Sequence, residues 1–315
     1  MIRVLHGDCR ELLPTLPDAS VQCVVTSPPY YGLRSYLPDG HPDKSLELGL
    51  EATPDEYVAQ MVAVFREVRR VLRDDGTVWL NLGDSYAAST KGSGGHNPKQ
   101  DSNRGSWMDD CSWRIPSGLK PKDLLMMPAR VALALQADGW WLRSDIIWHK
   151  PNPMPESVTD RPTSSYEHVF LLTKRSRYFY DADAVREDAE YGRSVETASW
   201  HAKADAGSAG VRFSNTSTPG NGGTRNCRNV WTIATSPYRG AHFATFPPEL
   251  AERCIRAGSK PGDTILDPFG GAGTTGLVAD RLQRNVVLIE LSPGNCDQSR
   301  DRIVADCPLL AEAAD

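Results

Sequence analysis

The fold is decided by the stretch Asp267-Pro268-Phe269-Gly270-Gly271-Ala272-Gly273-Thr274-Thr275, a glycine-rich loop between two regular segments. The apolar residues 264–266 before it predict a buried strand, and the residues after it predict a helix. Glycines at such a junction let the backbone turn tightly and approach a ligand closely. We therefore expect a βαβ unit that binds a ligand at the carboxyl end of its first strand.

An acidic residue ends the next predicted strand, residues 286–289. Glu290 follows Asp267 by 290 − 267 = 23 positions, a spacing that suits a carboxylate binding ribose hydroxyls. The loop is neither GxGxxG nor a Walker sequence with its lysine. The pattern therefore favours an adenosine-bearing ligand without phosphates over a dinucleotide or a nucleoside triphosphate.

The N-terminal half alternates strands and helices. Strands are predicted at 2–5, 21–25 and 77–82, and helices at 9–16 and after Thr53, which has the features of an N-cap. This β-α-β-α-β order predicts an α/β fold with a doubly wound sheet. Later patterns predict helices at 124–137 and 247–257 and strands at 140–148 and 168–173.

A second motif, Thr26-Ser27-Pro28-Pro29-Tyr30, directly follows a predicted buried strand. Its prolines fix the backbone and remove two N–H donors, so carbonyl oxygens can serve as acceptors. With the Ser27 hydroxyl and the Tyr30 ring, the loop suits an amino group on a planar base, which must leave the helix stack to reach it. Ser27, Pro28, Pro29 and Tyr30 are the candidate catalytic residues. No strong general base lies in the motif, so we expect the released proton to pass to solvent.

Together, and in this order, the two motifs resemble those of the amino-methyltransferases of DNA, specifically their permuted β group. The resemblance covers nearly the whole chain except two polar segments. It implies a Rossmann-like, S-adenosylmethionine-dependent methyltransferase core with a doubly wound mixed sheet and a circularly permuted motif order. S-adenosyl-L-methionine is the implied cofactor.

The resemblance also implies a cofactor site. Glu290 is expected on the ribose, Asp8 near the adenine, and residues 242–247 over the methionine moiety, although Phe243 stands where the family often has proline. The implied cofactor-binding residues are Asp8, Thr26, His242, Phe246, Asp267, Phe269, Gly271, Gly273, Thr274, Thr275 and Glu290.

The residue before Pro-Pro-Tyr, Ser27, suggests the target base. In the family, serine before Pro-Pro-Tyr goes mostly with cytosine N4, and aspartate or asparagine with adenine N6, so Ser27 favours N4-methylcytosine. Methylation of adenine N6, of RNA or of a protein glutamine stays an alternative, as does an inactive DNA-binding protein on the same fold. Cytosine C5 chemistry is excluded, because its nucleophile typically lies in a Pro-Cys dipeptide and the chain has none.

Two polar segments, about 86–122 and 184–240, are the candidate target-recognition regions of a single methyltransferase domain, 1–315, in which 241–315 is the cofactor-binding half. Double-stranded DNA is the expected partner, with a homodimer and a cognate restriction endonuclease as further possibilities. Each DNA-contact candidate is also compatible with a purely structural role. These candidates are Arg34, Tyr36, Lys150, Asn152, Met154 and Arg161.

Composition narrows the class of protein. The chain has 315 residues, 40% of them hydrophobic, and no apolar run near 18 residues, so no membrane span is expected. The seven cysteines are scattered and include no C-x-x-C pair, which argues against a disulfide framework or a metal site and for the cytoplasm. The net charge of −5 does not by itself indicate nucleic acid, because phosphate binding needs only a local basic face.

Overall fold

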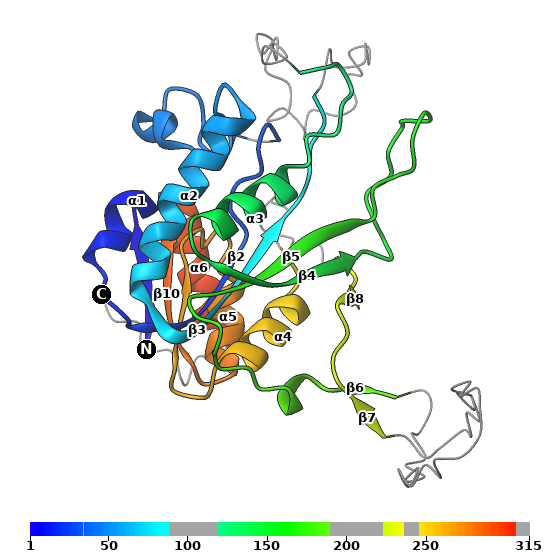
Figure 1. The fold of residues 1–315 in the computed structure, drawn as a ribbon. Helices are drawn as coiled ribbons and strands as arrows, with labels where there is room; N and C mark the ends of the chain where they lie inside the picture. The colour runs from blue at the N-terminus through cyan, green and yellow to red at the C-terminus, as the bar shows by residue number, and fades with distance from the viewer. Residues whose placement is uncertain (34, 88–118, 190–222, 236–245, 307–315) are drawn as a thin grey trace, which may run out of the picture. The chain divides into compact units, whose positions relative to one another are not determined.

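Figure 1 shows the computed structural model, which describes residues 1–33, 35–87, 119–189, 223–235 and 246–306. The chain divides into two compact units: Met1–Tyr180 with Asn229–Asp315, and Asp181–Arg228. The first unit holds both sequence motifs and is built around a mixed sheet. None of the helices in the described ranges is long and apolar enough to cross a membrane.

The main sheet has eight strands within the described residues. Their order is β1 (Ile2–His6), β10 (Asn285–Glu290), β9 (Thr264–Asp267), β2 (Val21–Thr26), β3 (Leu72–Leu82), β5 (Tyr166–Thr173), β4 (Trp141–His149) and β8 (Val230–Thr232). The strands from β1 to β3 are parallel, whereas β5 is antiparallel to both of its neighbours. β8 pairs in parallel with β4. The sheet is therefore doubly wound and mixed, as the sequence predicts.

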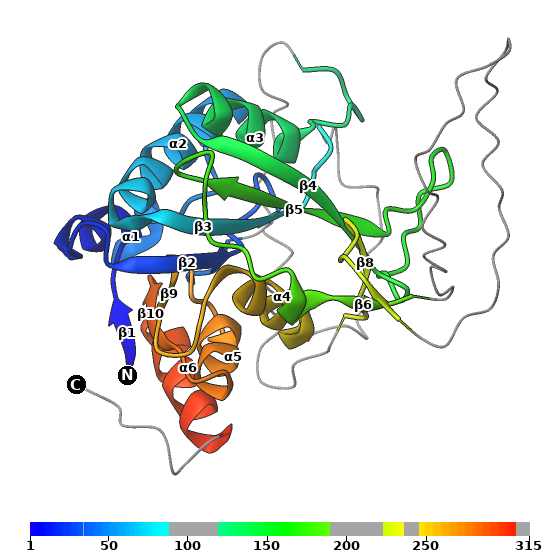
Figure 2. The same ribbon diagram turned by 60° about the horizontal axis from the view of Figure 1, so that its bottom comes forward.

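Helices cover both faces of this sheet (Figure 2). One face carries α1 (Cys9–Leu12), α2 (Pro54–Val71) and α3 (Met127–Ala137), and the other carries α4 (Pro248–Gly258), α5 (Thr274–Arg281) and α6 (Pro293–Asp306). Every residue of β2 is buried, as expected of a parallel strand covered on both sides. The N-terminal part of the chain also contains two short 3-10 turns, η1 (Leu13–Thr15) and η2 (Pro42–Leu46).

α2 shows how local sequence sets an element. Thr53 and Glu56 form a reciprocal capping box, and the apolar face that includes Tyr57 and Val68 is buried. The helix ends earlier than its pattern suggests, because Leu72 is extended, fully buried and paired with Val21. β3 therefore begins at Leu72 rather than at Thr77.

The topology brings the motifs to one edge of the sheet. β10 follows β9 on one side, and β3 follows β2 on the other, so the winding reverses between β9 and β2. Ligands of open α/β sheets bind at such a switch point, outside the carboxyl ends of the strands. Asp267 ends β9, Glu290 ends β10, and Ser27 follows β2, so the fold gathers them at this position.

The second unit is small. Its described part holds η4 (Asp183–Val185) and a two-stranded antiparallel ladder of β6 (Glu187–Asp188) and β7 (Thr224–Arg225). Arg225 and Arg228 both donate to Glu187. Most of the predicted recognition segments, at 88–118, 190–222 and 236–240, lies outside the described residues.

Candidate functional site

A pocket lies at the carboxyl ends of β1, β10, β9 and β2. Its walls come from residues 7–9, 267–272 and 289–292, with Ser27 and Pro29, and from a loop that contributes residues 36–37 and 46–48. Several residues singled out in the sequence meet here. They are Asp8, Ser27, Pro29, Tyr36, Phe246, Asp267, Phe269, Gly271, Thr274 and Glu290.

Asp267 is a buried carboxylate that joins the two halves of the chain. Its Oδ1 accepts hydrogen bonds from Thr26 Oγ1 at 2.6 Å and from the Phe269 amide at 3.1 Å, and its Oδ2 accepts one from Thr275 Oγ1 at 2.7 Å. Burial raises the pKa of this carboxyl to about 6 despite these donors. Thr26 and Thr275 thus stand behind the pocket wall and fix Asp267 between β2 and α5.

Glu290 holds the glycine loop in place. Its Oε2 accepts from the Gly271 amide at 2.8 Å, and its Oε1 accepts from the Ser292 amide at 2.9 Å and from Asn295 at 3.2 Å. Gly273 begins α5 with a φ of +74°, and a side chain there would lie 2.9 Å from Ser299. The loop therefore needs glycine both for its conformation and for its close approach to α6.

Asp8 caps α1 and is 8% exposed at the pocket. Arg10 binds both of its oxygens, with Nη2 2.5 Å from Oδ2, and also donates to the Leu46 carbonyl at 2.9 Å. The Asp8–Arg10 pair thereby connects the end of β1 to the loop on the opposite wall.

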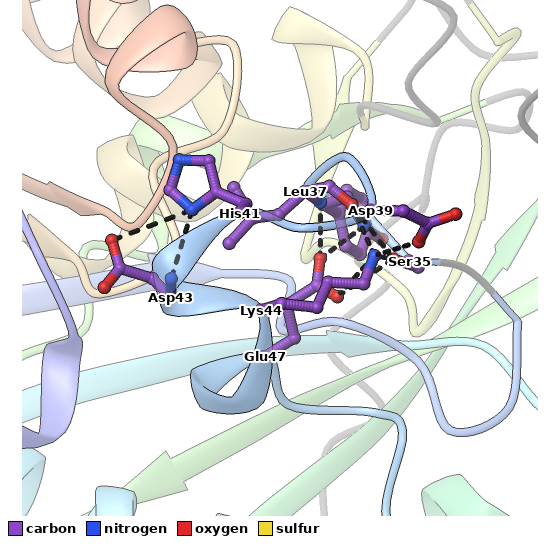
Figure 3. Close-up of polar contacts among 8 residues, drawn as sticks. Ser35, Leu37, Asp39, His41, Asp43, Lys44 and Glu47 are labelled. Carbon is purple, nitrogen blue, oxygen red and sulfur yellow. Dashed lines mark hydrogen bonds and ion pairs between the residues drawn. The ribbon is translucent and has the colours of Figure 1, made fainter.

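The loop of residues 35–48, which contributes to the pocket wall, has its conformation fixed by Glu47 (Figure 3). The Glu47 side chain is only 2% exposed. Its Oε1 accepts from the amides of Tyr36 and Leu37 at 2.5 Å each, and its Oε2 accepts from Ser35 Oγ at 2.9 Å. Lys44 lies 3.4 Å from Oε2 and balances the charge.

The Thr26–Tyr30 loop is bonded on its side away from the pocket. Ser27 Oγ donates to Tyr30 Oη at 3.1 Å, and Tyr30 Oη donates to Glu167 Oε2 at 2.8 Å, with Asn81 Oδ1 as a second possible acceptor at 3.0 Å. Tyr57 donates to the Pro29 carbonyl at 2.8 Å. The Tyr30 ring lies against Gly83, where a Cβ atom would come within 2.5 Å of the ring.

Comparison with known proteins agrees with this geometry. The family model described as DNA methylase, which covers N6 and N4 methyltransferases, matches residues 21–301. The type II methyltransferase M.XycI of Xanthomonas campestris pv. cyanopsidis is 46% identical over 300 residues, covering 95% of this chain and 87% of the relative. The chain belongs to the N6/N4 DNA methylase family. M.SmaI of Serratia marcescens, another type II methyltransferase, is 44% identical over 304 residues, covering 96% and 90%.

Solved structures share the methylase fold. PvuII DNA methyltransferase, named as cytosine-N4-specific, aligns with a TM-score of 0.63 and 21% identity over 100% of this chain and 88% of its own. TTHA0409 of Thermus thermophilus, solved with S-adenosyl-L-methionine, aligns with a TM-score of 0.59 and 24% identity over 98% and 97%. The fold is therefore that of S-adenosylmethionine-dependent DNA methyltransferases.

The DNA-contact candidates of the methylase lie in different settings. Met154 is 82% exposed beyond β4. Asn152 is tied to the Thr235 backbone by two hydrogen bonds, and Arg161 bonds Glu156 and stacks over Tyr86. Lys150 pairs with Glu167. Arg34 and His242 lie outside the described residues.

Three polar residues at the site of the methylase were missed by the sequence reasoning: Glu47, Asn81 and Glu167. None belongs to a motif: Glu47 meets its partners within its own loop, and Asn81 and Glu167 meet each other across the sheet. The sole available signal for Glu47 was the long connection between β2 and α2, a kind of segment that is usually functional. Asn81 and Glu167 come together because β5 inserts antiparallel beside β3.

Proposed function

We propose that this chain is a site-specific DNA methyltransferase that transfers a methyl group from S-adenosylmethionine to cytosine N4. Ser27 carries the proposal for two reasons. Serine before Pro-Pro-Tyr goes mostly with cytosine N4 in this family, and Ser27 lines the pocket at the switch point. The fold shared with the cytosine-N4-specific PvuII enzyme supports the same target.

The pocket residues fit the cofactor. A carboxylate has about four lone-pair sites, and three protein donors bind Glu290, so room remains for a ribose hydroxyl. Phe246 and Phe269 offer apolar surface, and Asp8 lies at the end assigned to the adenine. We propose that these four residues, with the Gly271 backbone, hold S-adenosylmethionine, which supplies an electrophilic methyl group.

The remaining cofactor candidates shape the site in this proposal and do not contact the cofactor directly. Thr26 and Thr275 fix Asp267, Gly273 and Thr274 begin α5, and His242 would close the site as the resemblance implies. We propose that Asp267 positions the loop, because the three groups that donate to it belong to the protein itself.

The catalytic loop binds the amino group. A base amine is a weak nucleophile because its lone pair is delocalised into the ring. Acceptors at Ser27 Oγ and the Pro28 carbonyl stabilise the tetrahedral nitrogen that can attack the methyl group. Tyr57 donates to the Pro29 carbonyl, which supports the Pro28 carbonyl as the acceptor for the substrate. The Tyr30 ring would stack on the flipped base.

Cytosine C5 chemistry does not fit the pocket. Cys9 lines it, but burial raises the pKa of that thiol to about 12, which disfavours the thiolate needed for covalent attack. This supports transfer to an exocyclic amino group.

Double-stranded DNA is the proposed substrate, read by the segments at about 86–122 and 184–240. Arg34, Tyr36, Lys150 and Met154 are the proposed contacts nearest to the flipped base. The relatives are named type II methyltransferases, so we further propose a cognate restriction endonuclease, a cytoplasmic location and, as in the permuted group, a homodimer.

The test is product identity. DNA methylated by the purified protein is digested to nucleosides and analysed by mass spectrometry, with RNA as a parallel substrate. We expect N4-methylcytosine from DNA alone. Exclusive N6-methyladenine would overturn the choice of base, and methylation of RNA alone would overturn the choice of substrate.

A further inference from the structure

A line of hydrogen bonds leads from the catalytic loop to a carboxylate outside the pocket. Ser27 donates to Tyr30 over 3.1 Å, and Tyr30 donates to Glu167 over 2.8 Å. Both donors point the same way, from the pocket toward Glu167. This is the polarity that proton movement along hydroxyl groups requires.

We propose that Glu167 is the final acceptor of the proton that the target amino group loses, with Ser27 and Tyr30 as the relay. The inference rests on the proposed function, since it needs an amino group bound at Ser27. It replaces the direct loss of this proton to solvent with a defined route through the protein.

The step balances in atoms and charge. As the carbon–sulfur bond of the methyl donor breaks, a carbon–nitrogen bond forms, the sulfur keeps the bonding electrons, and the nitrogen carries one proton too many. Ser27 Oγ takes that proton and passes its own to Tyr30 Oη, which passes its own to Glu167 Oε2. The sulfonium cation and the Glu167 carboxylate anion are both neutralised, so the net charge of the reacting groups is unchanged.

Asn81 explains why the proton ends on Glu167. Asn81 Oδ1 is the other possible acceptor of the single Tyr30 hydroxyl proton, at 3.0 Å, but a neutral amide oxygen is too weak a base to keep a proton. The Asn81 Nδ2 group donates to Glu167 Oε2 at 3.0 Å and to the His168 carbonyl at 3.1 Å, which fixes the orientation of the amide. Asn81 is therefore a positioning residue that aims the carboxylate at Tyr30.

The surroundings of Glu167 suit a resting anion. Lys150, at the end of β4, pairs with Oε1, and Tyr30 and Asn81 contact Oε2 from the catalytic loop and β3. Burial, and then the Glu167 charge, raise the pKa of Tyr30 well above its usual value, so its hydroxyl stays protonated between turnovers. The Glu167 side chain keeps 16% exposure, through which water can remove the proton afterwards.

The test begins with single-turnover methyl transfer to DNA, counted as radioactive methyl groups whichever base accepts them. Glu167→Gln keeps the size of the side chain but cannot take the proton, and Tyr30→Phe keeps the ring but breaks the line. We expect each to slow transfer about 10²- to 10⁴-fold, the usual contribution of acid–base catalysis. The double variant should be no slower, because the residues act as one unit.

Asp145→Asn is the matched control. It is the same acid-to-amide change on the neighbouring strand β4, where Asp145 bonds His168 rather than Tyr30. We expect its transfer rate to stay within twofold of wild type.

Buffer dependence separates proton transfer from positioning. In Glu167→Gln the proton must pass to an external base, so the rate should rise with pH and with the concentration of buffer base. The wild-type rate should not depend on buffer. A slow Glu167→Gln variant with wild-type buffer and pH dependence would overturn the relay and make Glu167 a positioning residue, and a variant as fast as wild type would overturn it outright.

A second readout needs no turnover. With ¹³C-labelled glutamate carboxyl groups, the resonance missing in Glu167→Gln identifies Glu167, and Tyr30→Phe should shift it by removing its hydroxyl donor. An unshifted resonance would contradict the hydrogen bond on which the relay depends.

Failure of the proposed function has its own signature. If wild type yields N6-methyladenine, the choice of base is wrong, but the relay is still tested by the same variants. If wild type transfers no methyl group to any DNA, both proposals fail.

Discussion

Two carboxylates in the pocket wall are bound in different ways. Glu290 accepts two backbone amides and one side-chain amide, whereas Asp267 is enclosed by two threonine hydroxyls and one amide. Neutral hydroxyls only partly offset the loss of water around a buried charge. Asp267 therefore links β2 to β9. Burying its carboxyl has a free-energy cost when that group is ionised.

That cost predicts a pH dependence of stability. Because the pKa of Asp267 rises from 3.8 to about 6 on folding, its stabilising contribution is complete below 3.8 and is lost as pH rises through 6. Asp267→Asn lacks this term. From pH 5 to pH 8, wild type should lose about 1 to 2 kcal/mol of unfolding free energy relative to Asp267→Asn. Urea unfolding of both proteins measures this, and parallel pH profiles would contradict the assignment.

Ser27 can be tested separately from cofactor binding. Ser27→Ala removes one acceptor for the amino group and the first hydroxyl of the relay, so single-turnover transfer should fall at least about 10²-fold. The dissociation constant for S-adenosylmethionine, measured by calorimetry, should change less than twofold. Ser20→Ala, the control, removes a surface hydroxyl that donates to the Pro17 carbonyl and is not part of the pocket wall. Undiminished transfer by Ser27→Ala would refute its role.

Among the elements, the loop of residues 35–48 has little regular structure, yet it forms one wall of the pocket (Figure 3). Its conformation depends on Glu47, which gathers two amides, a hydroxyl and an ammonium group. A buried carboxylate with several donors can fix a loop whose regular structure is limited to one short 3-10 turn.

Loss of this anchor should weaken cofactor binding. Hydrogen bonds to charged groups contribute about 1.5 to 3 kcal/mol each, so Glu47→Ala should loosen the wall and raise the dissociation constant for S-adenosylmethionine about tenfold or more. Glu47→Gln should be milder, because one amide oxygen can keep both backbone donors. Asp39→Ala, which removes an exposed partner of Lys44, is the control. Equal affinity of all three variants, by calorimetry, would show that the wall does not depend on Glu47.

Local sequence patterns predicted the helices and strands themselves better than they predicted which of them lie side by side. Apart from β8, the strands of the main sheet follow from periodicity, α2 from its cap, and the glycine loop from its composition, and Glu290 was singled out because it ends a strand at a characteristic distance from Asp267. Glu167 was missed because nothing local to β5 indicates that it pairs with β3 and β4. Side-chain partners set by sheet order, such as Asn81 with Glu167, need the tertiary structure.

Considered as a whole, the molecule builds its pocket from both ends of the chain. β1 pairs with β10, and Thr26 bonds Asp267 across 241 positions. Residues of both halves thus line one pocket, although the glycine loop and Glu290 lie in the C-terminal part.

Ligand binding should therefore protect distant segments together. S-adenosylmethionine at about 100 times its dissociation constant adds about 2.7 kcal/mol of stability. Hydrogen exchange should then slow at residues 7–9, 35–48, 269–273 and 290–292, while β4 and β5 change little. Protection confined to residues 246–306 would contradict a pocket shared by both halves.

The pairing of β1 with β10 also affects the order of events during synthesis. β1 leaves the ribosome long before β10, so it gains its described neighbour only when Val286 and the residues around it have followed. Until then the edges of β1 and β2 are open, and unpaired strand edges invite pairing with other chains. Before β10 emerges, the chain lacks the part of the pocket that includes Glu290, and yield in the cell should depend on chaperones that cover these edges.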